Sequence, residues 1–137
     1  MLKWFLGIAL VFVFGIAFYL FQYGGWRVKR DIAAFADHLS ECSPMDQDFY
    51  DPLSGNTMNR RVEGVEDNTC RVSFDTYSPQ RLYCAFAVDD LPAIANGFRV
   101  RADNVDWLGG FKLSYNSDNP DPVSALLSSP ACEARNP

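Results

Sequence analysis

The sequence predicts an α+β protein with an N-terminal transmembrane helix, followed by an amphipathic helix packed on a small antiparallel sheet that is disulfide-stapled. Three observations predict it: an uncharged apolar run near the N-terminus, a helical apolar stripe directly after that run, and two alternating strand patterns that each carry a cysteine. We expect two parts, a transmembrane signal-anchor at residues 1–26 and one small α+β domain at residues 27–137.

The apolar run covers residues 4–21 without a charge, and uncharged residues continue to Trp26. A helix needs about 20 apolar residues to cross the hydrocarbon core of a bilayer. Trp4 and Trp26 would lie about 33 Å apart along such a helix, so both indoles can lie at the headgroups. Cleaved signal peptides usually have a shorter apolar stretch, closely followed by a small-x-small site. The only good site of that kind, at residues 34–36, lies well beyond the run. We therefore expect an uncleaved anchor that contacts the lipid bilayer through residues 4–26.

The charges beside the run and the cysteines predict opposite orientations. Arg27, Lys29 and Arg30 follow the run, whereas only Lys3 and the terminal amine precede it, so the positive-inside rule favours a cytoplasmic domain. Four dispersed cysteines without CxxC or zinc-type spacing favour two structural disulfides in an oxidising compartment. The alternative is four buried thiols in a reduced domain.

The cysteines decide the orientation, because so short an N-terminal tail leaves the charge rule little to compare. We expect a single-pass protein of the cell inner membrane with its C-terminal domain in the periplasm. The candidate disulfide residues are Cys42, Cys70, Cys84 and Cys132.

The charge of the domain excludes one class of partner. All 17 acidic residues lie at or after Asp31 together with 8 of the 12 basic ones, which gives that part of the chain a net charge of −9. Such a surface repels nucleic acid and anionic lipid. We expect no nucleic-acid partner, and only the basic residues beside the anchor can meet headgroups.

Directly after the anchor, apolar residues recur at steps of four and three, which marks one face of a helix. The face consists of Val28, Ile32, Phe35, Leu39 and Cys42. Pro44 stops the helix, so Cys42 should close it and point toward the core. The Gly24-Gly25 pair either hinges the two helical parts or lies within one long rod.

Alternating patterns at residues 69–77 and 81–88, joined by a Ser-Pro turn, predict two antiparallel strands. A weaker strand at residues 57–64 precedes them and completes a meander with one buried face. We predict a loop at residues 45–56. Its three aspartates lack the Gly and the terminal Glu of a calcium-binding loop, so a solvated turn is the better interpretation.

Three further elements are predicted downstream. Residues 89–102 predict a helix with Asp90 as its N-cap, and residues 109–117 predict another strand. Residues 119–132 predict a short helical turn before a mobile tail that holds Cys132.

The register of the two strands limits how the cysteines pair. Cys70 falls opposite a residue near Phe86 or Val88, so a Cys70–Cys84 bond would need a slip that turns one strand inside out.

One strand cysteine should therefore bond to Cys42 and the other to Cys132, and the sequence leaves the choice open. We slightly prefer Cys42–Cys84, because a mid-strand position lies under a crossing helix. Cys70 would then bond to Cys132.

The sequence holds no nucleophile elbow, zinc-protease helix or glycine-rich phosphate loop. His38, the only histidine, precedes Cys42 by one helical turn and would form a metal pair only with a free thiol. A solvent-facing histidine is the simpler interpretation. We expect no catalytic, cofactor-binding or metal-binding residue, no cofactor and no enzyme activity.

The order of a helix ending in Cys42-Ser43-Pro44, a polar loop, and the strands "EGVEDNTCRVSF" and "RLYCAFAV" looks like small exported bacterial domains of unknown function with cysteine-bearing antiparallel strands. The likeness spans about residues 39–91. It implies an envelope location and no activity.

These observations favour a membrane-anchored extracytoplasmic module that binds another envelope protein or helps to organise the envelope. A pilin-like structural subunit is one alternative, although the sequence lacks the Gly cleavage point followed by Phe and a Glu near the start of the run. An enzyme with an unrecognised site is another.

Overall fold

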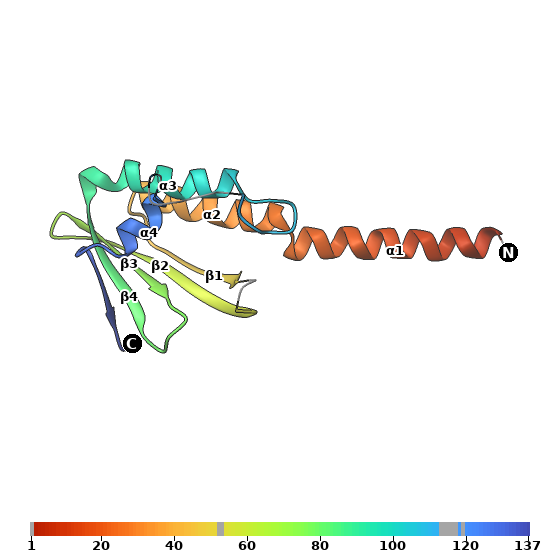
Figure 1. The fold of residues 1–137 in the computed structure, drawn as a ribbon, viewed down its shortest axis with the longest axis horizontal. Coiled ribbons are helices and arrows are strands. Elements are labelled where there is room, and N and C mark those ends of the chain that lie inside the picture. Colours follow the sequence, from red (N-terminus) through yellow and green to blue (C-terminus); the bar gives the residue numbers. More distant parts are fainter. Residues whose placement is uncertain (1, 52–53, 113–117, 119) are drawn as a thin grey trace.

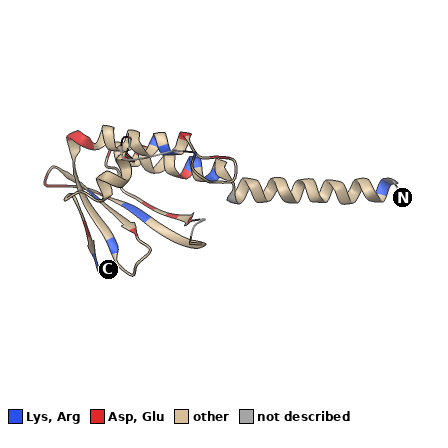
Figure 2. Ribbon diagram, viewed as in Figure 1, with Lys and Arg blue, Asp and Glu red and all other residues tan. Residues whose placement is uncertain are grey.

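Two helices open the chain, α1 (Leu2–Tyr23) and α2 (Gly25–Ser40). The structure, a computed structural model, describes residues 2–51, 54–112, 118 and 120–137. α1 extends away from the rest of the molecule as a rod (Figure 1). Its most apolar window has a mean hydropathy of 2.4 and none of that window is buried, so by length and composition α1 can cross a membrane. Figure 2 shows Lys and Arg at the start of α2, directly beyond the uncharged part of α1.

The two glycines between α1 and α2 permit a bend and a close backbone contact. Gly24 is extended, with φ −82° and ψ 177°, so the chain forms two helices and not one rod. The Gly25 amide donates a hydrogen bond to the Trp107 carbonyl at 3.0 Å. A Cβ atom on Gly25 would lie 1.6 Å from the Asp106 carbonyl oxygen. Glycine is therefore required for the chain near Trp107 to lie against the start of α2.

Gly25→Ala is expected to destabilise the domain by about 1–3 kcal/mol, the usual cost of overpacking. The added methyl group must push the Asp106 carbonyl away, and the hydrogen bond from Gly25 to Trp107 is lost with it. Thermal unfolding of the full chain in detergent, followed by near-ultraviolet circular dichroism, measures the change. Gly15→Ala is the matched control, because nothing lies within 4 Å of that added Cβ in α1. Equal unfolding temperatures for the two variants would show that this contact does not form.

α2 buries the face that the sequence predicts. Ile32, Phe35 and Leu39 are buried, and Val28 is half-buried at the start of the stripe. Cys42 is buried as expected, but it lies beyond the end of the helix, with a φ of +48°. It thus belongs to the turn that leads into the sheet and does not close the helix.

A five-stranded antiparallel sheet packs against α2, with strand order β1-β2-β3-β4-β5 (Figure 1). The strands are β1 (Met45–Asp51), β2 (Asn56–Glu66), β3 (Thr69–Asp75), β4 (Arg81–Ala87) and β5 (Cys132–Arg135). The predicted strands at residues 57–64, 69–77 and 81–88 are β2, β3 and β4. Cys70 lies opposite Phe86, which confirms the predicted register.

β1 overturns the loop predicted at residues 45–56. Its residues alternate between half-buried and exposed, and Asp46 and Asp48 lie on the exposed face. The Asn59 side chain of β2 donates to both carboxylates, at 2.6 and 2.8 Å, and Arg61 pairs with Asp46 at 2.5 Å. Hydrogen bonds from Asn59 and Arg61 hold the pKa of Asp46 below its usual value. Aspartates are tolerated on the solvent-exposed face of an edge strand. Because residues 45–51 are rich in aspartate, the sequence suggested a loop although their burial alternates as in a strand.

α3 (Leu91–Asp103) lies beside α2 and covers the same face of the sheet (Figure 1). Ion pairs from Lys29 to Asp103 at 3.2 Å and from Asp37 to Arg99 at 2.9 Å show that the two helices run antiparallel. The short 3-10 helix η1 (Val88–Asp90) precedes α3. The predicted helix is thus confirmed, although the Asp90 side chain makes no capping hydrogen bond.

The last part of the chain differs from the prediction at two places. The predicted helical turn is α4 (Pro122–Leu127), but the expected mobile tail is strand β5. Residues 113–117 of the strand predicted at 109–117 lie outside the described residues. In the described part of that segment, Phe111 forms an isolated bridge with Val105.

Candidate functional site: a cavity beside a buried arginine

Both disulfides that the sequence predicts are present, but not in the preferred pairing. Cys42 bonds to Cys70 and Cys84 bonds to Cys132, and no cysteine among the described residues is free. Cys70 of β3 and Cys84 of β4 therefore do not bond to each other, as expected: one bonds to Cys42 and the other to Cys132. The preferred Cys42–Cys84 and Cys70–Cys132 bonds are wrong.

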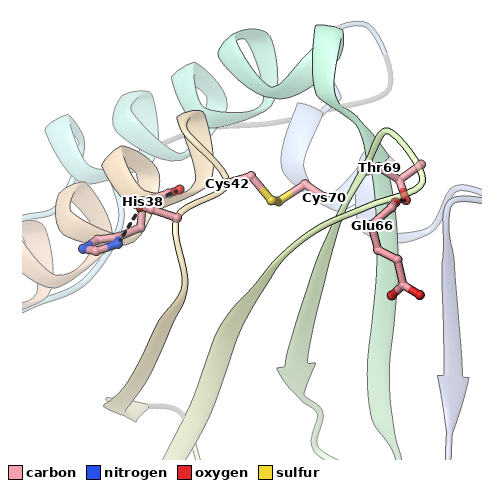
Figure 3. Close-up of a disulfide and its surroundings, with 6 residues drawn as sticks. His38, Cys42, Glu66, Thr69 and Cys70 are labelled. Carbon is pink, nitrogen blue, oxygen red and sulfur yellow. Dashed lines mark hydrogen bonds between the residues drawn. A yellow bond between two sulfur atoms is a disulfide. The ribbon is translucent and has the colours of Figure 1, made fainter.

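The tail and the end of α2 explain this pairing. β5 pairs with the edge of β4 and places Cys132 directly opposite Cys84, with 4.1 Å between their Cα atoms. Figure 3 shows Cys42, after the end of α2, reaching Cys70 at the start of β3. α2 thus ends over the end of the sheet and not over its middle, which removes the reason for joining Cys42 to Cys84.

His38 does not take part in a metal site with Cys42, because that thiol is consumed in the disulfide. The His38 side chain points away from the disulfide (Figure 3), and its Nδ1 atom lies 2.9 Å from the Ser43 hydroxyl. It is half-buried, and not solvent-facing as the sequence suggested. In the described part of the chain, no three His, Cys, Asp or Glu side chains gather as a metal site would require.

A cavity of about 680 Å³ lies between the helices and the sheet. Gln22 of α1, the start of α2 and the strand ends at Asp51 and Asp75 all contribute to its wall, so it lies at the end of the domain nearest α1. Apolar side chains form much of that wall, namely Val28, Ile32, Phe49, Met58, Phe74, Leu82, Phe98, Phe111 and Leu127. Its size and lining are typical of ligand sites in proteins.

Arg60 on the inward face of β2 is the unusual residue of this wall. It is only 6 % exposed, and its guanidinium lies between two phenyl rings, 4.8 Å from the Phe35 centroid and 4.7 Å from the Phe49 centroid. Its Nε atom donates to the Gln47 side chain at 2.6 Å. Its Nη2 atom is buried without a hydrogen-bond partner. A buried, unsatisfied donor on a cation is costly and needs an explanation.

The nearby carboxylates do not supply the missing partner. Asp31 pairs with Arg27 and Arg30, at 3.7 and 3.6 Å, and no carboxylate of the described residues lies within 4 Å of the Arg60 guanidinium. Burial lowers the pKa of Arg60 to about 10, and the charge of Asp31 opposes that shift. Arg60 is therefore charged at neutral pH and can attract an anion or a carbonyl oxygen.

Sequence reasoning missed Arg60, although a signal was present. Arg60 lies two residues before Val62 in the predicted strand, and alternation puts both on the face that packs against the helices. A lone cation on an inward face is a candidate binding group. The weakness of the strand pattern at residues 57–64 concealed it.

Arg60→Met is expected to change the free energy of unfolding by less than about 1 kcal/mol. Methionine fills the space between Phe35 and Phe49, and losing the cation–ring contacts is offset by removing a buried charge that lacks a carboxylate. Arg60→Ala, which also removes the packing, should be clearly less stable. Denaturant unfolding of the full chain in detergent compares the two. A large loss in Arg60→Met would mean that the fold itself depends on the cation.

Comparison of this chain with protein families, with curated proteins and with solved structures found no match.

Proposed function

We propose that this protein is a single-pass inner-membrane protein whose periplasmic domain binds another envelope protein and helps to organise the envelope, without catalysis. α1 acts as an uncleaved signal-anchor. The cavity beside Arg60 receives an apolar segment of the partner, and the guanidinium binds a carboxylate or carbonyl oxygen of that segment.

The proposed location is supported by α1 and by the two disulfides. An unburied apolar helix of this length suits a bilayer, and structural disulfides persist in oxidising compartments. Reporter fusions after Pro137 test the orientation. A periplasm-active reporter should function and a cytoplasm-active one should not, and the reverse result would overturn the proposed location.

The observation that carries the proposed binding role is the cavity with a buried cation. Arg60 lines the cavity and pairs with no carboxylate of the described residues, so its positive charge favours an acceptor group at this wall. The net charge of −9 after the anchor disfavours a polyanionic ligand, which leaves a mostly apolar segment with one acceptor group. Buried aromatic and arginine contacts of this kind are typical anchors of protein interfaces.

Site-specific photo-crosslinking in cells tests the partner. A photoreactive residue at Leu82, in the cavity wall, should capture one envelope protein, whereas the same residue at Ala85 should not, since Ala85 is exposed on the opposite face of β4. Adding Arg60→Met should remove the crosslink without loss of the protein. Equal capture from both positions, insensitivity to Arg60→Met, or capture of lipid alone would overturn the proposal.

A pilin-like structural subunit is the second candidate, and the shape of the molecule favours it. An apolar helix leads into an amphipathic helix that packs on a disulfide-bearing antiparallel sheet (Figure 1). Type IV pilins have that arrangement, but they are processed before assembly. A mature protein that begins at Met1 would exclude this candidate.

A further inference from the structure

The turn at residues 106–111 presents apolar side chains to solvent at the α1 end of the domain. Trp107 is 69 % exposed and Leu108 61 %. The side-chain carboxylate of Asp106 accepts a hydrogen bond from the Leu108 amide at 2.9 Å. The backbone carbonyl of Asp106 accepts one from the Gly109 amide at 3.1 Å. The turn is thus held closed by its own groups, with both apolar side chains outside the core.

The turn is fastened to the chain where α1 ends. The Gly25 amide donates to the Trp107 carbonyl at 3.0 Å, and a Cβ atom on Gly109 would lie 3.3 Å from the side chain of Val28. The ring of Trp26 stacks on Phe21 in the last turns of α1, with 5.1 Å between centroids. Trp26 and the turn therefore both lie beside the end of α1. Figure 1 shows the chain after α3 returning to the junction of α1 and α2.

The charges at this level suit lipid headgroups. Arg27, Lys29 and Arg30 follow α1 directly (Figure 2), and the Arg30 guanidinium lies 5.0 Å above the ring of Trp26. Exposed indoles beside cations are typical of the membrane–water interface, where the ring contacts acyl chains and the cations meet anionic headgroups. In water, the same cluster would leave apolar surface unburied.

We infer that the 106–111 turn is a second membrane contact, whose Trp107 and Leu108 side chains enter the headgroup region of the bilayer that α1 crosses. The occupant is the bilayer because the cluster is continuous with the end of the anchor. This inference rests on the proposed membrane anchoring of α1. Two contacts, at α1 and at the turn, fix the tilt of the domain and hold the end that contains the cavity near the membrane surface.

Quenching of tryptophan fluorescence by brominated lipids tests this contact. The full chain with Trp4→Phe and Trp26→Phe keeps Trp107 as its only tryptophan. It is reconstituted into vesicles of phosphatidylcholine and phosphatidylglycerol brominated near the top of the acyl chains. Trp107 should lose most of its emission to the brominated lipid and resist quenching by aqueous iodide. Leu108→Asp should reverse both effects, because it places a charge in the apolar contact.

Two control proteins make the result decisive. In the first, all three tryptophans are replaced by Phe and Val65→Trp is added, since Val65 is 59 % exposed and lies opposite Cys70 at the far end of the sheet. In the second, only Trp4 is kept to report on α1. Quenching of Trp4 without quenching of Trp107 would overturn the second contact alone. Quenching of neither would overturn the anchor and the contact together, and equal quenching of Trp107 and residue 65 would mean that no particular face meets the bilayer.

Discussion

Cys42→Ser and Cys70→Ser should each lower the free energy of unfolding by about 3.6 kcal/mol, and the double variant should lose no more than either single one. The bond joins residues 28 apart, and the loss of that loop constraint from the unfolded chain accounts for the size of the effect. For Cys84→Ser and Cys132→Ser, with a separation of 48, the same argument gives about 4 kcal/mol. Each is a large share of the stability of a small domain.

The mixed double variant is the control for the pairing. Cys42→Ser combined with Cys84→Ser breaks both bonds, so its loss should be the sum of the two single losses. Denaturant unfolding of the full chain in detergent, under non-reducing conditions, measures all of these variants. Non-additivity in this mixed pair, with additivity in the Cys42–Cys70 pair, would contradict the connectivity described above.

Phe35→Ala should lower the free energy of unfolding by about 3–5 kcal/mol, the range for a fully buried phenyl group. Phe35 has no exposed surface, and its ring lies edge-on to Phe74 and Phe98, with 5.6 and 5.1 Å between centroids. One face of the ring also meets the Arg60 guanidinium. Removing it opens a void between α2 and the sheet and leaves Arg60 with one aromatic neighbour fewer.

Phe111→Ala is the matched control for Phe35→Ala. Phe111 is the same residue type but is 52 % exposed, so its truncation should cost less than about 1 kcal/mol. Thermal unfolding of both variants, followed by near-ultraviolet circular dichroism, gives the comparison. Similar losses of unfolding free energy in the two variants would mean that Phe35 does not lie in the core of the domain.

The Cys42–Cys70 disulfide and the cavity lie at opposite ends of the sheet. The Cys42–Cys70 bond joins the end of α2 to the sheet far from α1, whereas the cavity lies between α2 and the sheet at the end nearest α1. Variants of the disulfide should therefore change stability first, and variants of Arg60 should change binding first.

Much of the fold follows from local sequence patterns. The stripe from Val28 to Leu39 requires a helix with one buried face, and the alternation around Cys70 and Cys84 requires two strands in one register. These elements are set by which side chains must leave water, and neighbouring residues are enough to decide that. The same holds for the length of the apolar run, which makes α1 long enough for a bilayer.

The tertiary structure alone decided the pairing of the cysteines, the strands at both edges and the cavity. Cys132 meets Cys84 because β5 joins the edge of β4, and a four-residue strand is stabilised by its neighbour and not by its own composition. Gly25 is required by the Asp106 carbonyl, which lies 81 residues later in the chain. Arg60 becomes a candidate binding group only when two aromatic rings from α2 and β1 enclose it. Each of these features depends on contacts between distant segments, and local periodicity does not encode which segments meet.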